Sequence, residues 1–477
     1  MPRNIKKVVI VGGGITGLST AFFLQEKGKE TGCTIDITLI EGESRLGGMI
    51  HTERVDDFIL EGGPDSFITQ KPGAVDLCRR LGLMDDLVHT REVEKSVYIL
   101  SSGKLRPLPE GFNLMVPGRL TPFLFSPLVS PIGKVRMGLD LVIPKKNSPE
   151  DESIASFVRR RLGDEALQKF AEPILAGIFA GDVEKLSLYA TFPQFASLEK
   201  SSRSLILGMW TRRMAAAKKG GTKPELTLFV TLREGLSSLV SSIRKKLDEV
   251  KFVSDTRVSG IDPQNSGYAV FTENEKHLAD AVAVTTKTDT AARWIEGWDP
   301  SLSALLKEIE YVSTATVSLG FRREDVHHSL NGFGFVVPRR EGKKIIASTW
   351  SSTKFPGRAP EGHVLVRAFL GGAHHEDLVG RDEDELIGLV RKELQPILGI
   401  QAEPVVAKTF RWIKSRPQYN LGHLDRIAMI EKEAKKHPGF FLAGAAYRGV
   451  GLPDCIRQGM ETAEKIIRMG QTQAGPS

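Results

Sequence analysis

Hydrophobic positions along the first forty residues follow the order strand, helix, strand. Four consecutive apolar residues, Val8 to Val11, predict a central parallel strand that is buried on both faces. The apolar spacing from Ile15 to Gln25 predicts a helix, which we expect to end at Gly28. A second strand is predicted over residues 34–41. This order is typical of a doubly wound α/β fold that binds a nucleotide at its first turn.

Further along the chain, helical and strand patterns alternate. Helical patterns occupy residues 71–83, two stretches of 153–182 that are separated near Gly163, and the last part of 225–247 after a strand. Residues 250–272 alternate like paired strands, and residues 280–286 form another continuous apolar strand. Segment 291–405 is rich in strands at first and ends in a helix, so we expect a sheet that forms the floor of a substrate pocket. A strand over residues 440–442 precedes the last predicted helix.

Composition indicates an ordinary globular chain. Of its 477 residues 41% are hydrophobic and 26% charged, and the formal net charge of +7 is spread along the sequence. This mild positive charge suits an acidic substrate or an anionic membrane surface, and no zinc, homeodomain or RNA-binding signature suggests nucleic acid. Three unpaired cysteines and the absence of a signal peptide or an apolar spanning run favour the cytoplasm. Ten scattered histidines predict no metal site.

Candidate chemistry begins with the glycines after the first strand. Gly12, Gly14 and Gly17 form a G-x-G-x-x-G fingerprint, which permits a tight turn, close approach of a pyrophosphate and close packing of helix on strand. The N-terminus of the following helix directs its free N–H groups at the phosphates. Glu41, at the end of the second strand, can accept hydrogen bonds from both hydroxyls of an adenosine ribose. The complete unit predicts a dinucleotide.

A second glycine cluster follows directly. Glu41, Arg45, Gly47 and Gly48 spell E-x3-R-x-G-G, which resembles the FAD-containing family of amine oxidases, phytoene desaturases and porphyrinogen oxidases. The resemblance implies noncovalent FAD, an arginine near its phosphates, and the backbone of Val258 against its adenine. The residues that we assign to the cofactor are Gly12, Gly13, Gly14, Ile15, Thr16, Gly17, Glu41, Gly42, Arg45, Gly47, Gly48, Gly62, Gly63, Pro64, Asp65, Val258, Trp412, Gly444, Val450, Gly451 and Leu452.

Other motifs narrow the resemblance. The stretches EGGPDSF, EPILAGIFAGD, LSLYATFPQF, RSLILGM and GVGLPDCIRQG resemble the porphyrinogen oxidases of haem synthesis, specifically the soluble Gram-positive bacterial type. The resemblance implies a six-electron oxidation of coproporphyrinogen III, and also of protoporphyrinogen IX, with dioxygen as acceptor and peroxide as product. No catalytic side chain is predicted, because the chemistry centres on the flavin.

Substrate contacts rest on fewer residues. A large apolar disc that carries propionates needs a wide apolar pocket with a cation at its rim. Lys71 is our candidate for that cation, although it fits a plain surface lysine as well. Gly177, Ile178 and Phe179 lie in a segment whose carbonyl groups could meet pyrrole N–H groups, and a tight turn between helices is the alternative.

These patterns predict an α/β protein of three discontinuous domains. The ranges are 1–72, 224–290 and 406–470 for a Rossmann-like FAD-binding domain, 73–84, 183–223 and 291–405 for a substrate-binding domain with a β-sheet floor, and 85–182 for an inserted helical domain. In the last of these, Phe123, Leu124 and Phe125 line either an apolar cavity or a patch that rests on a membrane. Peripheral membrane contact and hand-over of product to the next haem-synthesis enzyme therefore stay open.

Two rival functions also stay open. One is an amine oxidase on the same scaffold; Cys455 in PDCI lacks the context of a covalent flavin attachment, but some amine oxidases bind their flavin noncovalently. The other is a flavin-free binding protein of the Rab escort and dissociation-inhibitor type, against which the intact phosphate and flavin motifs speak.

Overall fold

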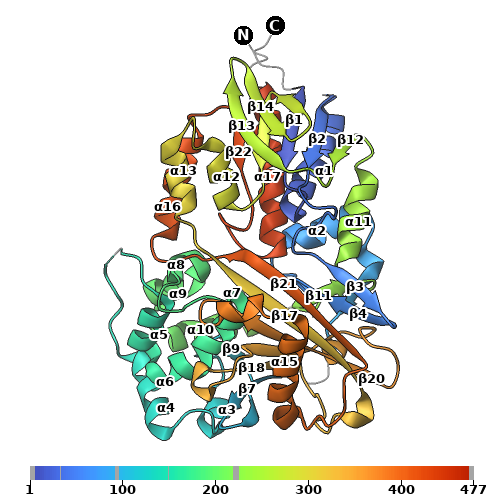
Figure 1. Ribbon diagram of the computed structural model, residues 1–477. Helices are drawn as coiled ribbons and strands as arrows, with labels where there is room; N and C mark the ends of the chain where they lie inside the picture. The colour runs from blue at the N-terminus through green and yellow to red at the C-terminus, as the bar shows by residue number, and fades with distance from the viewer. Residues whose placement is uncertain (1–5, 33, 92–95, 149, 219–224, 472–477) are drawn as a thin grey trace.

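A parallel sheet, a long antiparallel sheet and a group of helices make up the molecule. The computed structural model describes residues 6–32, 34–91, 96–148, 150–218 and 225–471. In Figure 1 the parallel sheet around β1 (Lys7–Val11) lies at the top, and helices from α3 (Leu120–Phe125) to α10 (Leu205–Lys218) gather at the lower left. The long strands β17 (Tyr311–Arg322) and β21 (Val406–Pro417) run diagonally between these two parts.

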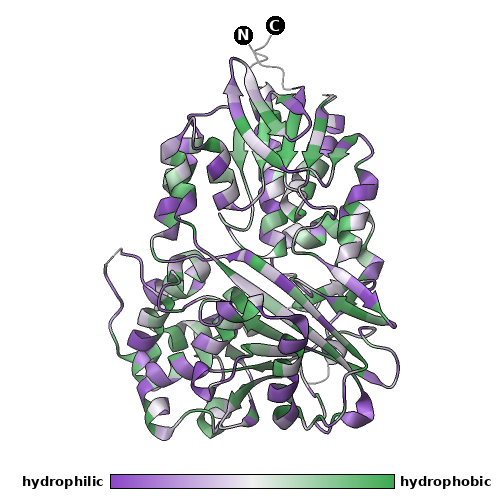
Figure 2. Cartoon of the chain, viewed as in Figure 1, coloured by the Kyte–Doolittle hydropathy of each residue, from purple (hydrophilic) through white to green (hydrophobic). Residues whose placement is uncertain are grey.

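Five parallel strands form the upper sheet. Their order is β12 (Val250–Val253), β2 (Asp36–Ile40), β1, β16 (Ala281–Val284) and β22 (Phe440–Leu442). The strands predicted from continuous apolar runs are confirmed. β1 begins one residue before the predicted run and β16 is shorter than its predicted range, and both are buried almost throughout. Figure 2 shows this sheet as largely hydrophobic. The sheet therefore joins segments from the beginning, the middle and the end of the chain.

The first helix is longer than predicted. α1 spans Ile15–Thr31, and Gly28 lies inside it as a buried residue. The helix ends at Gly32, whose φ of 69° is left-handed and whose N–H bonds to the carbonyl oxygens of Gly28 and Lys29. The predicted end at Gly28 was therefore wrong. Its last turn is polar and exposed, so the apolar periodicity that marks a helix in sequence stops too early.

Seven strands form the lower sheet. Their order is β21, β17, β20 (His363–Gly371), β19 (Ala347–Trp350), β18 (Gly334–Val336), β7 (Val97–Ser101) and β8 (Lys104–Pro107). Ala315, Val317 and Leu319 of β17 share a core with α15 (Glu383–Leu398), so the even-numbered Thr314 and Thr316 point to the opposite face. On that face Thr316 Oγ1 donates to the carbonyl oxygen of Gly62.

The predicted domain boundaries do not coincide with breaks between sheets. β21 lies in the lower sheet although residues 406–470 were assigned to the FAD-binding domain, and β7 and β8 extend the same sheet from the range assigned to the helical domain. The reason is pairing across long distances in sequence: β21 joins β17, and β7 joins β18. The division into three domains stays a prediction.

The helical part has its own core, built around Phe157, Phe170 and Leu175. Its other elements are α4 (Pro131–Gly138), η2 (Leu139–Leu141), α5 (Ile154–Leu162), α6 (Asp164–Ala166), η3 (Leu167–Ala171), α7 (Glu172–Phe179), α8 (Leu188–Thr191) and α9 (Pro193–Ser202). The break predicted near Gly163 is confirmed, because α5 ends there. Among the described residues, no helix has both the length and the apolar character that crossing a membrane requires.

Shorter elements complete the fold. One hairpin pairs β3 (Thr52–Val55) with β4 (Phe58–Glu61), and another pairs β9 (Phe112–Asn113) with β10 (Val116–Pro117). One three-stranded sheet consists of β5 (Phe67–Ile68), β11 (Phe229–Leu232) and β6 (Leu87–His89). A second consists of β13 (Val258–Gln264), β14 (Gly267–Thr272) and β15 (Lys276–Ala279). The remaining helices are α2 (Pro72–Leu81), α11 (Ser237–Lys246), α12 (Thr288–Ile295), α13 (Pro300–Lys307), α14 (Ser351–Lys354), α16 (His423–Ala434) and α17 (Leu452–Gln471), with the short turns η1 (Met84–Asp86), η4 (Arg323–Asp325), η5 (Arg339–Glu341) and η6 (Glu376–Gly380).

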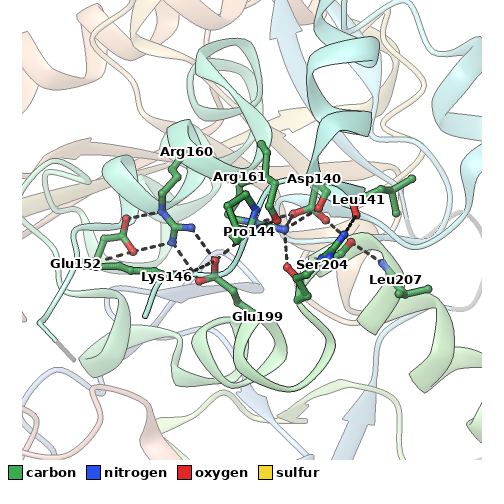
Figure 3. A network of polar contacts seen from close by, with 12 residues as sticks. Asp140, Leu141, Pro144, Lys146, Glu152, Arg160, Arg161, Glu199, Ser204 and Leu207 are labelled. Carbon is green, nitrogen blue, oxygen red and sulfur yellow. Dashed lines mark hydrogen bonds and ion pairs between the residues drawn. The ribbon is translucent and has the colours of Figure 1, made fainter. Parts of the chain in front are cut away.

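A buried ionic network holds the helical part together (Figure 3). Arg161 is fully buried, and its Nε donates to Asp140 Oδ1 at 2.7 Å. The same guanidinium donates to the carbonyl oxygens of Ile143 and Arg203. The other carboxylate oxygen of Asp140 accepts from Ser204 Oγ at 2.6 Å, so one ion pair joins η2, α5 and the start of α10.

Candidate active site

The glycines of the fingerprint differ sharply in the space around them. A Cβ atom on Gly17 would lie 1.9 Å from the carbonyl oxygen of Gly12, and one on Gly13 would lie 2.5 Å from the side chain of Leu46. A Cβ atom on Gly14 would meet nothing within 4 Å. Gly14 is the N-cap of α1, and the first turn of this helix holds no acidic residue. The open space at Gly14 therefore lies beside the free N–H groups at the start of the helix.

The two glycine clusters of the sequence are in direct contact. Gly13 N–H donates to Glu41 Oε2 at 2.6 Å, and Glu43 N–H donates to the other carboxylate oxygen at 3.0 Å. Gly47 N–H donates to the carbonyl oxygen of Gly13 at 2.8 Å, and Gly14 and Gly47 form an isolated parallel bridge. The carboxylate of Glu41 therefore orders both loops and keeps further lone pairs for a ligand.

Arg45 shapes the second loop from within. Its guanidinium donates to the carbonyl oxygens of Gly48 and Ile50, each at 2.6 Å, and to that of Leu46 at 3.1 Å. Burial lowers the pKa of Arg45, and the nearby carboxylates of Glu41 and Glu43 act in the opposite direction. Within the described part of the chain, this guanidinium hydrogen-bonds to its own loop, and its role near phosphates stays a prediction.

The loop at Gly62 and Gly63 is anchored to the lower sheet. The carbonyl oxygen of Gly62 accepts from Trp412 Nε1 at 2.9 Å and from Thr316 Oγ1 and Arg367 Nη2, both at 3.0 Å. Arg367 Nη2 also donates to the carbonyl oxygen of Gly63 at 2.5 Å. The even-numbered face of the lower sheet is therefore the face on which this loop rests. Sequence reasoning named Trp412 but missed Thr316 and Arg367.

Asp65 is the charged end of the same loop. It pairs with Lys354 Nζ at 2.9 Å and accepts from Ser66 Oγ at 2.7 Å. Burial alone would raise the pKa of Asp65, but the charges of Lys354 and Arg367 outweigh burial and lower this pKa to about 2. Asp65 is thus ionised at neutral pH. Lys354 was also missed from the sequence, where it is one lysine in a polar stretch.

The C-terminal loop meets the N-terminal glycines at Thr285. A Cβ atom on Gly12 would lie 2.9 Å from Thr285 Oγ1, and one on Gly444 would lie 3.7 Å from the carbonyl oxygen of Thr285. Gly444 has a φ of 137°, which is a glycine conformation. Tyr419 Oη donates to the carbonyl oxygen of Ala445 at 2.6 Å and accepts from Gly449 N–H at 2.7 Å. The structure therefore brings the two ends of the chain together.

Helices α1 and α17 pack side by side behind these loops. A Cβ atom on Gly459 would lie 2.7 Å from the carbonyl oxygen of Thr16, which shows how close the two helices approach. Val450 and Gly451 lie directly before α17, and Leu452 is its first residue. The N-termini of both helices are therefore beside the two glycine-rich loops, where a helix favours negative charge.

Two other residues predicted from the sequence to bind substrate or cofactor are Lys71 and Val258. Lys71 Nζ pairs with Asp454 Oδ2 at 2.6 Å, and its side chain is 55% exposed. Val258 begins β13, and its carbonyl oxygen accepts from Trp294 Nε1 at 3.1 Å. A binding role of Lys71 or Val258 stays a prediction.

The segment Gly177–Phe179 is the last turn of α7. A Cβ atom on Gly177 would lie 3.9 Å from Val336 of β18, and Ile178 is 39% exposed. The carbonyl oxygen of Phe179 accepts from Gln418 Nε2 at 3.2 Å. The helical part thus meets the lower sheet at this turn, and its role in substrate binding stays a prediction.

His423 supports the C-terminal loop and makes stability depend on pH. Its ring stacks on Tyr419 at 3.9 Å between centroids, and Nε2 lies 3.2 Å from the carbonyl oxygen of Tyr447. Burial lowers the pKa of His423 to about 4. The unfolded chain, with a histidine pKa near 6.5, takes up a proton first as the pH falls. This group therefore removes stability between about pH 6.5 and pH 4.

We expect His423→Gln to weaken that pH dependence. In the native chain, protonation of His423 in the unfolded state lowers the free energy of unfolding by at most about 3 kcal/mol at pH 4 relative to pH 7. The variant lacks this loss. The measurement is the free energy of unfolding in urea at pH 7, 6, 5 and 4 for both proteins. If the free energy of unfolding falls with pH in parallel for the two proteins, His423 is not the source of the pH dependence.

The architecture and these loops agree with comparisons to known proteins. The profile of a family described as "Flavin containing amine oxidoreductase" matches residues 15–467. The chain belongs to this family. It is 39% identical over 461 residues to the coproporphyrinogen III oxidase of Bacillus subtilis (strain 168), which covers 96% of this chain and 97% of that protein. It is 35% identical over 469 residues to the coproporphyrinogen III oxidase of Staphylococcus aureus, with 97% and 99% covered.

A solved structure agrees over the same length. The crystal structure of a provisionally named protoporphyrinogen oxidase from Exiguobacterium sp. 255-15 matches with a TM-score of 0.84 and 33% identity, and covers 97% of this chain and 98% of that one. The predicted α/β fold and the predicted family are therefore confirmed. The protein is a flavin-dependent oxidoreductase, and its cofactor is FAD.

The described residues fit this cofactor. The open space at Gly14 suits a pyrophosphate, and the carboxylate of Glu41 suits a ribose. Cys78 and Cys455 are buried free thiols, and burial raises the pKa of each to about 12. Protonated, enclosed thiols are poor nucleophiles, which favours noncovalent binding. Cys33 lies outside the described residues.

Proposed function

We propose that this protein oxidises coproporphyrinogen III to coproporphyrin III, and protoporphyrinogen IX to protoporphyrin IX, in haem synthesis. The observation that carries the proposal is the match to two coproporphyrinogen III oxidases, which runs along almost the whole of each chain. A match of this extent includes the lower sheet and the helical part, where a substrate would bind, and not only the nucleotide-binding loops.

The reaction balances without a catalytic acid or base. A porphyrinogen loses six electrons and six hydrogens, and three molecules of dioxygen become three of hydrogen peroxide. FAD, when bound, supplies the site that accepts a hydride and passes the electrons to dioxygen. The product gains an aromatic macrocycle, so the overall oxidation is downhill.

The residues of this chain position the substrate beside the flavin and exclude water. Arg367, Thr316 and Trp412 hold the loop at Gly62 against the sheet, which fixes one wall of the chamber. Val336 and the last turn of α7 offer apolar contact for a macrocycle on the side of the helical part. Orientation of this kind is the main contribution a protein makes to a flavin reaction.

The direct test is an aerobic fluorescence assay with both porphyrinogens and a panel of primary and polyamines side by side. We expect porphyrin emission well above autoxidation from the porphyrinogens, and no peroxide from the amines. Peroxide from an amine alone would favour the amine oxidase, and a colourless protein that does not take up FAD would favour the binding protein.

An exposed apolar surface lies on the helical part. Phe125 is 84% exposed, Ile132 83% and Trp210 55%. The other large exposed hydrophobic residues in this region are Leu120, Leu124, Val135, Leu139, Leu141, Val142, Leu207 and Met214. Several of them line a groove of about 680 Å³ between α3, α4, η2 and α10. Of the three residues predicted for a cavity or a membrane patch, only Phe123 is buried.

We propose that this apolar surface contacts an anionic membrane. The groove is also lined by Arg119, which pairs with exposed Glu110, and by Lys134 and Arg213. No acidic residue is among the described residues that line it. Apolar side chains surrounded by cations match a bilayer surface that carries negative headgroups. The buried ion pair between Arg161 and Asp140 keeps η2 and α10 together, so the surface is part of the folded molecule.

Vesicle sedimentation tests this contact. The double variant Phe125→Ser/Ile132→Ser should bind vesicles of phosphatidylglycerol and phosphatidylcholine about tenfold or more weakly than the native chain, and neutral vesicles should bind neither protein. Leu278→Ser, at a residue that is 58% exposed on β15, is the matched control. Vesicle binding by the double variant that equals that of the native chain would contradict the proposal. So would a result in which the double variant loses binding to a partner enzyme but still binds vesicles like the native chain.

A further inference from the structure

Arg416 is a cation near the end of β21. Its Nε is buried without a hydrogen-bond partner, and among the described residues no carboxylate pairs with it. The side chain as a whole keeps some accessible surface. Burial, and then the positive charge of Arg367, lower the pKa of Arg416 to about 10, so it stays protonated at neutral pH. An enclosed guanidinium of this kind is unfavourable unless an anion meets it.

Strand register places this side chain on the face of the lower sheet that holds the loop at Gly62. Arg416 is paired with Val312 of β17. The pairing of β17 with β21 shifts register between Val312 and Thr314, but β17 itself is continuous, so Val312 shares its face with Thr314 and Thr316. Thr316 is the residue that holds the loop at Gly62, and Thr314 Oγ1 is another buried polar atom without a partner. The guanidinium therefore lies on the face of the lower sheet that carries the flavin-side loop.

The last turn of α7 is close by. Gln418 Nε2 donates at 3.2 Å to the carbonyl oxygen of Phe179 and at 3.2 Å to that of Arg416. The two carbonyl oxygens therefore lie within twice that distance of each other. Gln418 therefore fastens the end of β21 to the segment Gly177–Phe179, and the backbone of Arg416 lies beside the last turn of α7.

We propose that Arg416 binds a propionate carboxylate of the substrate inside the chamber and thereby favours porphyrinogens with four propionates over those with two. The proposal rests on the proposed function. Arginine binds a carboxylate through two parallel hydrogen bonds, which suits an enclosed site better than lysine does. A disc with a propionate on every ring always directs one of them inward. A disc with two propionates on adjacent rings can keep both at the wet rim, and Arg416 then faces an apolar vinyl group.

The preference follows from the cost of an unpaired charge. A site built to hydrogen-bond a group discriminates strongly against an analogue that lacks it, because its own polar atoms are left without partners. Arg416→Met should therefore lower kcat/KM for coproporphyrinogen III at least about tenfold, mainly through KM, and leave that for protoporphyrinogen IX unchanged or higher. Arg416→Lys should recover part of the lost preference, since it restores the charge without the fork.

The experiment compares FAD-loaded native protein with Arg416→Met, Arg416→Lys and the control Arg411→Met, an exposed arginine of the same strand. Besides kinetics with both substrates, it measures the Kd of coproporphyrin III and of protoporphyrin IX and the flavin midpoint potential. We expect Arg416→Met to weaken coproporphyrin III binding selectively and to leave the potential unchanged.

Two results would overturn the assignment. Equal loss with both porphyrins would mean that Arg416 does not select between them, and a shifted potential with an unchanged ratio of the two Kd values would mean that it serves the flavin. If the native protein turns over neither porphyrinogen, the proposed function fails, whereas the ratio of the two Kd values still decides whether Arg416 recognises the additional carboxylates.

Discussion

Gly14→Ala should raise the Kd for FAD about tenfold or more and leave the apoprotein as stable as the native chain. The added methyl group would meet no protein atom within 4 Å, and Gly14 has φ −67° and ψ 176°, which any residue adopts. The stability of the apoprotein should therefore change by less than about 0.5 kcal/mol. The methyl would instead fill the space that we assign to the pyrophosphate, and close approach to the backbone would be lost.

Titration of the apoprotein with FAD, followed by quenching of flavin fluorescence, measures the effect. Gly138→Ala is the matched control, because Gly138 also has open space around it and is the last residue of α4, in the helical part of the molecule. Gly17→Ala should behave differently from both: its Cβ would lie 1.9 Å from a carbonyl oxygen, so the apoprotein itself should lose stability. Native FAD affinity in Gly14→Ala would place the pyrophosphate elsewhere.

Arg161→Met should lower the free energy of unfolding by about 3–5 kcal/mol. The substitution leaves the carboxyl group of Asp140 fully buried without its arginine partner, and several carbonyl oxygens lose their donor. Methionine matches the volume of the stem, so lost charge rather than lost packing dominates. Chemical unfolding of the native chain and the variant, followed by circular dichroism, measures the difference.

Arg159→Met is the control for this prediction. Arg159 is a neighbour on α5 whose exposed side chain pairs with Asp164 and Glu184, and pairs of this kind contribute about 1 kcal/mol or less. The double variant Arg161→Met/Asp140→Asn should recover part of the loss, because it also removes the buried charge. If Arg161→Met and Arg159→Met lower the free energy of unfolding by similar amounts, the buried ion pair contributes no more to stability than the exposed one.

The nucleotide-binding half was predictable because its signals are local. The run from Val8 to Val11, the glycines that follow and the acid at Glu41 each have a physical reason that acts within a few residues. Contact between the two glycine clusters followed from their position around one βαβ unit. The exposed last turn of α1 was missed for the same reason, since beyond Gln25 no apolar pattern marks the helix.

The lower sheet shows what a sequence pattern cannot supply. Arg367 and Lys354 are far from Gly62 and Asp65 in sequence, and only strand pairing brings them together. Arg367 did carry a signal, because it interrupts the apolar run VLVRAFL, and a charge inside a buried strand needs a partner. The partner of Lys71 was likewise invisible, since Asp454 lies 383 residues away.

Anaerobic mixing of the FAD-loaded protein with coproporphyrinogen III tests the central claim most directly. That claim is that the converging glycine loops hold FAD against a chamber that admits a porphyrinogen. The account predicts that the flavin absorption bleaches while porphyrin absorption grows, and that dioxygen restores the flavin spectrum. A flavin that stays oxidised in the presence of excess porphyrinogen would contradict the account.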